Sequence, residues 1–356
     1  MAKKSLFDPQ KAKLVIDKGR RAKWWLRKGS PSRGFGYYDI SGNKIGSDES
    51  LARIVALAIP PAWKSVRISP SASSKLQAVG IDTSGRVQYL YNVKFSESQQ
   101  RKKFAKIEKF GEYVPQLRKI TNEHILLEGF PREKVLAIMI RLMNSLYMRM
   151  GTEKSVKNYK TFGITTLQNR HLEIRRKREL IFQFVGKSSV KHRKILADEE
   201  LARLMTDLKQ LGASRKLFHY LDEEGKPRAV RPNEINHYLK SNTAPEFSAK
   251  DFRTWGATLL AAVELAELGK VDDDHQLKKN IDRAVKKAAE QLGNTPTVCR
   301  GSYIHPMVLK AYASGVILED FRPRNTRHKK RIEPEFEPEE QSLLRLFQEF
   351  GESRKL

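Results

Sequence analysis

The sequence of 356 residues has very little cysteine, because Cys299 is the only one. An internal disulfide is therefore excluded, and a chain without disulfides suits a reducing compartment, so we expect a cytoplasmic protein. An apolar run of about 18 residues, which a membrane-spanning helix needs, is also missing. The lysines near the N-terminus are not followed by the apolar stretch of a secretory signal. We therefore expect no association with a membrane.

Groups of metal-binding side chains are absent as well. Cysteines and histidines do not have the spacing of a zinc site, and carboxylates are not clustered as they are around Mg²⁺. The run Gly186-Lys187-Ser188 resembles the end of a phosphate-binding loop, but Ile181 stands where that loop needs its first glycine. The sequence therefore predicts neither a metal nor a nucleotide cofactor.

Negative charge is scarce relative to positive charge. Lysine and arginine number 68 against 41 aspartate and glutamate residues, so the formal net charge is +27. An excess of this size indicates a polyanionic partner. Nucleic acid is favoured over a membrane surface, because the basic residues are scattered and the sequence carries no lipidation motif.

Hydrophobic residues make up 39% of the chain, enough to bury the cores of two ordinary domains. Turn signals and alternating apolar residues predict a β-rich segment, and from about residue 99 the apolar period becomes helical. We expect an α+β fold whose larger, mainly α-helical part contains a three-stranded β insert, with a linker near residues 98–105 that bends. Its strands are expected at 161–167, 171–174 and 180–185, with a hairpin turn at 168–170. The expected segments are a basic N-terminal arm (1–33), a β-rich domain (34–100), a helical domain (101–320) and a basic, then acidic, helical tail (321–356).

One stretch combines a helix stop, a helix start and a tyrosine. Helically spaced apolar residues end at Leu292, and Gly293-Asn294 reads as the stop. Thr295 and Pro296 then predict a new helix with threonine as its N-cap, which places Tyr303 two turns along it. Taken alone, this pattern is more typical of a half-buried core tyrosine.

Four basic or polar residues stand out beside Tyr303. Arg149 closes an apolar helix, Lys187 lies on a tight turn between two strands, and Arg253 lies in the first turn of a helix expected at 251–268, with Asp251 as its N-cap. Asn294 lies at the helix stop. Each has an ordinary structural explanation by itself: a cation at a helix C-terminus, a turn lysine, a surface charge and a cap.

Together these positions lie in longer motifs. They are Tyr159-Lys160-Thr161-Phe162-Gly163-Ile164-Thr165-Thr166-Leu167, Phe184-Val185-Gly186-Lys187, Asp251-Phe252-Arg253-Thr254-Trp255-Gly256 and Leu292-Gly293-Asn294-Thr295-Pro296 with Tyr303. In this order and spacing the sequence resembles the type IB DNA topoisomerases, specifically the compact bacterial and poxvirus-like kind. The resemblance covers roughly residues 33–320 and includes Gly85-Arg86-Val87-Gln88-Tyr89-Leu90-Tyr91, which is similar to part of the family's DNA-clamping N-terminal domain.

The resemblance implies an ATP-independent enzyme that relaxes supercoiled double-stranded DNA. Tyr303 would attack a phosphodiester and hold the 3′ phosphate, Arg149 and Arg253 would stabilise the transition state, Lys187 would protonate the leaving oxygen, and Asn294 would donate a hydrogen bond. It also implies a monomer that closes around DNA as a two-lobed clamp, associated with the bacterial nucleoid.

Three residues of the β-rich segment are candidate DNA contacts. Gln88, Tyr89 and Tyr91 lie on one expected strand, on which the two tyrosines share a face and Gln88 does not. Glutamine can read adenine in the major groove, and tyrosine can bind phosphates. The alternative is that the aromatic pair packs a small barrel.

Two other functions remain open at this point. A tyrosine recombinase uses similar chemistry, but usually has histidine three residues before its second arginine, where this sequence has Lys250. A basic nucleic-acid-binding protein without enzymatic activity would explain the charge equally well. It would not explain the ordered set of two arginines, a lysine and a tyrosine.

Overall fold

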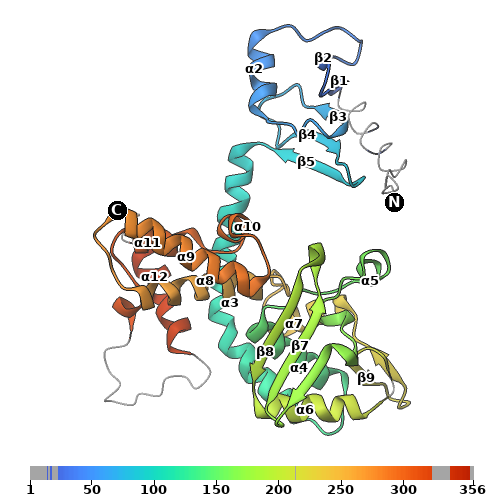
Figure 1. Cartoon of the computed structure of the whole chain (residues 1–356), viewed down its shortest axis with the longest axis vertical. Coiled ribbons are helices and arrows are strands. Elements are labelled where there is room, and N and C mark those ends of the chain that lie inside the picture. Colours follow the sequence, from blue (N-terminus) through green and yellow to red (C-terminus); the bar gives the residue numbers. More distant parts are fainter. Residues whose placement is uncertain (1–13, 15–16, 18–22, 213, 323–336, 353–356) are drawn as a thin grey trace. The chain divides into compact units, whose positions relative to one another are not determined.

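The computed structural model describes residues 14, 17, 23–212, 214–322 and 337–352. The chain divides into two compact units, residues 1–103 and 104–356, and each is described by itself (Figure 1). The expected α+β class is confirmed, because a small antiparallel sheet forms the first unit and helices dominate the second.

The first unit is built on a five-stranded antiparallel sheet with the strand order β2-β1-β3-β4-β5. Its apolar core includes Ile54, Val66 and Ile68, each at most 3% exposed. The strands and the helix are β1 (Trp25–Ser30), β2 (Gly34–Tyr38), α2 (Asp48–Ala56), β3 (Lys64–Ile68), β4 (Leu76–Ile81) and β5 (Val87–Tyr91).

Strand β1 corrects the prediction of a basic arm over residues 1–33. It lies between β2 and β3, and Arg27 donates hydrogen bonds to the backbone carbonyls of Pro60 and Trp63. The positive charge of this segment suggests a basic arm, but the segment contains a strand, and Arg27 is bonded to backbone within the first unit. Residues 1–13, 15–16 and 18–22 of the predicted arm lie outside the described residues.

The boundary between the two units falls between residues 103 and 104, within the expected 98–105 segment, but this segment lies inside the helix α3 (Val93–Ile125) and is not an open loop. The run from Ser98 to Ala105 contains neither glycine nor proline and is rich in glutamine, lysine and arginine, which favour helix. A change of apolar period along the chain therefore marked the start of a helix and not a break in the backbone.

The second unit packs its helices around α4 (Arg132–Leu146), in which every residue from Lys134 to Ile140 is buried. Its three-stranded antiparallel sheet, β6 (Leu172–Arg175), β7 (Glu179–Val185) and β8 (Lys191–Ala197), confirms the predicted β insert (Figure 1). A two-stranded sheet, β9 (His219–Leu221) and β10 (Pro227–Ala229), was not predicted. The other helices are α5 (Glu153–Tyr159), α6 (Glu199–Gln210), α7 (Pro232–Asn242), α8 (Asp251–Leu268), α9 (Asp274–Leu292), α10 (Pro296–Ser302), α11 (Pro306–Ala313) and α12 (Pro338–Glu352), with short 3₁₀ turns η1 (Ile164–Thr166), η2 (Asn169–His171), η3 (Lys187–Ser189) and η4 (Leu318–Phe321).

The first strand predicted for the insert, residues 161–167, and the hairpin turn at 168–170 are wrong. The segment instead packs backbone to backbone on the loop that follows α4: a Cβ at Gly163 would lie 2.5 Å from the carbonyl oxygen of Arg149. The hydroxyl of Thr165 accepts from the N–H of Gly151 and donates to its carbonyl. Residues that read as a β-branched strand are therefore used for close contact with this loop.

The N-cap predicted for α8 is off by one residue. Lys250 is the cap and Asp251 is the first helical residue. The Asp251 carboxylate accepts from the backbone N–H of Ser248 and pairs with Lys106 at 2.7 Å. This ion pair fixes the start of α8 near α3.

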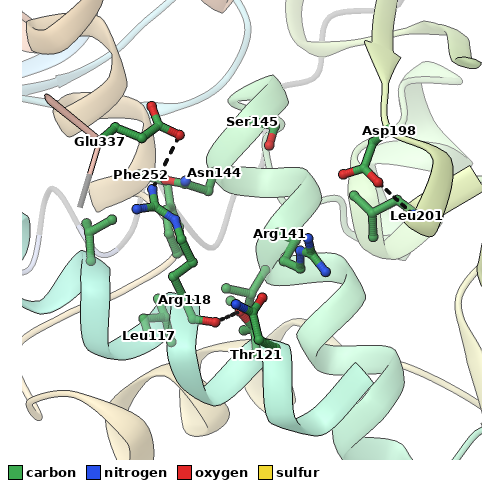
Figure 2. A pocket seen from close by; sticks show the side chains of 13 residues that line it. Leu117, Arg118, Thr121, Arg141, Asn144, Ser145, Asp198, Leu201, Phe252 and Glu337 are labelled. Atoms are coloured by element: carbon green, nitrogen blue, oxygen red, sulfur yellow. Dashed lines mark hydrogen bonds and ion pairs between the residues drawn. The ribbon is translucent and has the colours of Figure 1, made fainter. Parts of the chain in front are cut away.

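The acidic part of the tail contains the helix α12, whose Leu343 and Phe347 are buried. Arg118 of α3 binds the carboxylate of Glu340 at 3.1 Å and approaches Glu337 at 3.8 Å. Figure 2 shows Arg118 and Glu337 beside a polar cavity of about 290 Å³ between α3 and α4. None of the predicted site residues lines this cavity. The ion pair between Arg118 and Glu340 holds α12 on α3. Residues 323–336, including most of the predicted basic run, lie outside the described residues.

Candidate active site

The site is organised around the C-terminal end of α9. Gly293 ends the helix in the left-handed conformation, with φ 61°, as the sequence predicted. The last carbonyls of a helix lack partners within it, and here the N–H groups of Gly293 and Asn294 bond those of Glu290 and Ala289. The next two carbonyls, of Gln291 and Leu292, are left to accept from other elements. We call residues 289–294 the anchor turn.

Arg149 reaches the anchor turn from the loop after α4. That helix ends at Tyr147 in the left-handed conformation, which turns the chain outward, and the N–H of Ile164 bonds the Arg149 carbonyl at 2.9 Å. The guanidinium donates from Nη1 to the Leu292 carbonyl at 3.3 Å and from Nη2 to Oδ1 of Asn294. The chain therefore fixes both the backbone and the side chain of Arg149.

Arg253 reaches the same carbonyl from the first turn of α8. Its Nη2 donates to Leu292 at 2.9 Å and its Nη1 donates to the carbonyl of Tyr147. The side chain is only 3% exposed, and burial, followed by the charge of Arg149, lowers the pKa of Arg253 to about 10. It remains a cation at neutral pH and is held in one orientation.

Tyr303 lies over Arg253, with the guanidinium carbon 5.3 Å from the ring centre. Thr295 caps α10 as predicted, but Tyr303 is the residue that ends this seven-residue helix. The hydroxyl of Thr258 on α8 bonds the Tyr303 carbonyl at 3.2 Å. A pocket of about 260 Å³ is lined by Tyr303 together with Arg149, Arg253 and Lys250.

The phenol of Tyr303 is tuned by opposing effects. Burial by itself raises its pKa, but the charges of Arg253, Arg149 and Lys250 outweigh burial, and the pKa is lowered overall. Ionising an ordinary phenol at neutral pH costs about 4 kcal/mol. Each neighbouring cation stabilises the phenolate and so lowers this cost. The site therefore favours a nucleophilic oxygen at Tyr303.

Lys187 lies on the turn between β7 and β8 and is exposed. A second, narrow pocket is shared by Lys187, His192, Lys194 and the same two arginines, Arg149 and Arg253. Arg149 and Arg253 therefore line both pockets. Lys187 lines one of the two, and Tyr303 lines the other.

Two donors of this site are buried without a hydrogen-bond partner among the described residues: Nδ2 of Asn294 and Nε of Arg253. Buried donors in native structures are nearly always paired, so such atoms call for an acceptor. The contact of Oδ1 with Arg149 assigns the amide orientation and points Nδ2 elsewhere. A tetrahedral anion with several oxygens fits this set of donors.

Comparison with known proteins identifies the family. The family model for the catalytic core of eukaryotic DNA topoisomerase I matches residues 92–320, and the model for the N-terminal domain of bacterial DNA topoisomerase IB matches residues 34–82. The chain belongs to the type IB DNA topoisomerase family. DNA topoisomerase 1B of Acanthamoeba polyphaga mimivirus is 31% identical over 285 residues, which cover 78% of this chain and 84% of the viral protein. DNA topoisomerase 1 of Rabbit fibroma virus is 27% identical over 248 residues, 67% and 72% of the two chains, and DNA topoisomerase 1B of Vaccinia virus is 24% identical over 242 residues, 67% and 73%.

All five predicted catalytic residues fall within the type IB core match, whereas the three candidate DNA contacts on β5 fall between the two matched ranges. On that strand Tyr89 and Tyr91 share an exposed face as predicted, with ring centres 6.4 Å apart. Gln88 donates to the carboxylate of Asp82 at 2.8 Å, so its amide is already engaged within the turn.

Sequence reasoning missed Lys194 and the contribution of His192. Both belong to the inward-facing set of β8, and Lys194 is only 8% exposed, with its ammonium 2.6 Å from the carbonyl of Gln291. The alternation along residues 190–196 predicts these inward positions, but a strand so rich in basic residues draws attention to its charge instead.

Across the described part of the chain, acidic, histidine and cysteine side chains form no group suited to a metal ion, and the helices are too short or too polar to cross a bilayer.

Proposed function

We propose that the chain relaxes supercoiled DNA by cutting one strand transiently, with Tyr303 as the nucleophile and a 3′-phosphotyrosyl bond as the intermediate. Family membership supports the relaxation activity. The observation that carries the mechanism is the pocket lined by Tyr303, Arg149 and Arg253, together with the Nδ2 donor of Asn294, which has no partner among the described residues while its Oδ1 accepts from Arg149.

In the cleavage step the Tyr303 phenol releases its proton to water, and its oxygen attacks the phosphorus, forming the P–O bond to tyrosine while the bond to the 5′ oxygen breaks. Negative charge develops on the non-bridging oxygens of the phosphorane. Arg149 and Arg253 supply rigid, planar donors for these oxygens, and their positions are fixed before DNA arrives by the Leu292 carbonyl. Asn294 supplies a neutral donor from Nδ2, so its share is expected to be smaller than that of either arginine.

The leaving 5′ oxygen requires a proton, and we assign this transfer to Lys187. The residue lies on the turn between β7 and β8, in which Ser188 and Ser189 adopt φ near 60°, and its side chain is exposed. In the reverse step the 5′ hydroxyl returns its proton and attacks the phosphotyrosine.

One phosphoester replaces another in this reaction, so the strand is resealed without ATP, and cation side chains perform the electrostatic role that a metal has in other phosphoryl-transfer sites. We further propose that the enzyme acts as a monomeric clamp in which residues 34–100 and the catalytic domain at 101–320 both bind the duplex, with Tyr89 and Tyr91 as phosphate contacts. We expect it to act in the bacterial cytoplasm on nucleoid DNA. The net charge of +27 supports binding to the DNA backbone.

The test compares the unaltered chain with Tyr303→Phe on supercoiled plasmid, with a chelator and no nucleotide. We expect Tyr303→Phe to abolish relaxation and the denaturant-trapped covalent adduct while leaving salt-dependent binding within about twofold. Tyr113→Phe, which removes a hydroxyl from another half-buried tyrosine of the same unit, is the matched control and should relax DNA normally. Equal adduct formation by Tyr303→Phe and the unaltered chain would refute the assignment.

Two outcomes separate the alternatives. Steady relaxation of plasmids that share no recognition sequence argues against a recombinase. Strong binding without any covalent adduct would instead indicate a nucleic-acid-binding protein without enzymatic activity.

A further inference from the structure

We propose that Lys194 is a positioning residue of the catalytic site: it ties the hairpin that carries Lys187 to the anchor turn, which holds both arginines and Asn294. This inference rests on the proposed function, because it assigns Lys194 a part in that reaction. Lys194 itself is not assigned a contact with DNA.

Each of the last four carbonyls of α9 accepts a hydrogen bond. Two are bonded by the N–H groups of the cap, as described above, and the Leu292 carbonyl accepts from Arg149 and Arg253. The Gln291 carbonyl accepts from Lys194 Nζ at 2.6 Å. The anchor turn is thus held by three cations from three separate elements, the loop after α4, α8 and β8.

Lys194 lies on the same hairpin as Lys187. It is paired with Phe182 across β7 and β8, and the turn of Lys187 is built on the same two strands. Among the described residues, the hydrogen bond from Lys194 to the Gln291 carbonyl joins this hairpin directly to the anchor turn. A movement of β8 relative to α9 would therefore change the position of Lys187 relative to the arginines.

His192 reinforces the same junction by packing. A Cβ at Gly186, on the hairpin turn, would lie 2.5 Å from its ring, and a Cβ at Gly293 would lie 2.2 Å from it. The ring is stacked on Phe184 with centres 5.1 Å apart. The imidazole fills the space between the turn and the anchor turn, and Lys194 supplies the polar bond beside it.

Burying the ammonium of Lys194 beside two arginines costs free energy. Three cations in one small region repel one another, and burial followed by the charges of Arg253 and Arg149 lowers the pKa of Lys194. The C-terminal end of a helix carries partial negative charge, which offsets this repulsion only while the cations face it. The helix end thus acts as a resident counter-charge that keeps the cations assembled in the absence of a phosphate.

Replacing Lys194 with an apolar side chain would remove this bond without emptying the space. Since a misplacement of about 1 Å at a reacting group lowers a rate by about 100-fold, we expect Lys194→Met to slow single-turnover strand cleavage by about 10- to 100-fold. Duplex binding, which depends on exposed phosphate contacts, should stay within about twofold. Lys194→Arg retains a cation able to reach the carbonyl and should recover most of the cleavage rate.

Lys134→Met is the matched control. Lys134 is buried to the same extent, with 9% exposure, and its ammonium also donates to a backbone carbonyl, that of Leu127, at 2.6 Å, but it borders neither catalytic pocket. Thermal unfolding of both variants shows whether the two substitutions cost similar stability. Slow cleavage in Lys194→Met alone, at a similar loss of stability, supports positioning.

A double-mutant cycle completes the test. If Lys194 acts through the anchor turn, the effects of Lys194→Met and Asn294→Ala on the cleavage rate should be smaller together than the product of the two. Multiplicative effects would show that Lys194 acts independently of Asn294, and weaker binding with normal cleavage at saturating DNA would show that Lys194 contacts DNA directly. Either result would overturn the inference. So would a cleavage rate equal to that of Lys134→Met. An unaltered chain that forms no covalent adduct would instead refute the proposed function, so the two failures are distinguishable.

Discussion

The unfolding free energy of the catalytic unit should rise between about pH 8 and about pH 10.5, and Lys194 should be responsible for a large part of the rise. The folded chain lowers the pKa of this lysine from 10.5 to about 8, first through burial and then through Arg253 and Arg149. Above pH 8 the folded state releases this proton while the unfolded state still holds it. Because the unfolded state then binds more protons, stability increases with pH across this window.

The magnitude follows from the shift. At 1.36 kcal/mol per pKa unit, a change from 10.5 to about 8 corresponds to about 3 kcal/mol once the window is crossed. Other titratable or charged side chains lie around Lys194 or contact those that do, and they also contribute to the pH dependence. His192, whose pKa burial lowers to about 4, is already neutral, whereas Arg253 titrates near 10 and Tyr303 below its ordinary value. Exposed Lys187 and the guanidinium of Arg149 complete the set.

The assay must therefore isolate Lys194 by difference. Chemical denaturation of Tyr303→Phe and of Tyr303→Phe with Lys194→Met, measured at a series of pH values across the window, removes the contribution of the phenol. We expect the single variant to gain up to about 3 kcal/mol relative to the double variant as pH rises. Parallel curves for the two proteins would show that the ammonium is not perturbed by its surroundings, and the reasoning would fail.

Three further predictions concern other parts of the chain. Gly293→Ala should destabilise the catalytic unit by about 1–2 kcal/mol or more and slow cleavage, since φ is 61° and a Cβ would lie 2.2 Å from His192; Gly315→Ala, also at positive φ but with open space, measures the backbone strain alone. Glu340→Ala should lower the unfolding free energy by about 2 kcal/mol, because it removes the charged hydrogen bonds from Arg118 that hold α12 on α3, and a change below 0.5 kcal/mol in thermal unfolding would contradict this. Tyr91→Ala should weaken duplex binding about tenfold by losing a hydroxyl contact with a phosphate, and unchanged affinity at fixed salt would exclude Tyr91 as a contact.

The helix ends that position the candidate site were predictable because their local signals are strong. Gly293 needed a left-handed conformation and Thr295 with Pro296 needed a helix start, and both were found where the sequence placed them. Alternation along residues 87–91 likewise predicted the shared face of Tyr89 and Tyr91. In each case the side chain itself dictates the backbone.

The errors arose where tertiary contacts decide. Residues 161–167 have the composition of a strand, but Gly163 instead allows the backbone to touch that of Arg149. Arg27 contributed to the impression of a basic arm, yet it bonds carbonyls within the first unit. Lys194 was overlooked for the same reason: charge counts as surface until the partner of the charge, a carbonyl 97 positions away, is known.

The partner that gathers the cations of this site is peptide backbone, and that has a consequence for how the site can change in evolution and in the laboratory. Substitutions of Gln291 or Leu292 alter side chains but leave both accepting oxygens in place. Alanine scanning would therefore pass over the feature on which Arg149, Arg253 and Lys194 converge, whereas replacing the amide at this point by an ester, which weakens the carbonyl as an acceptor, would expose it.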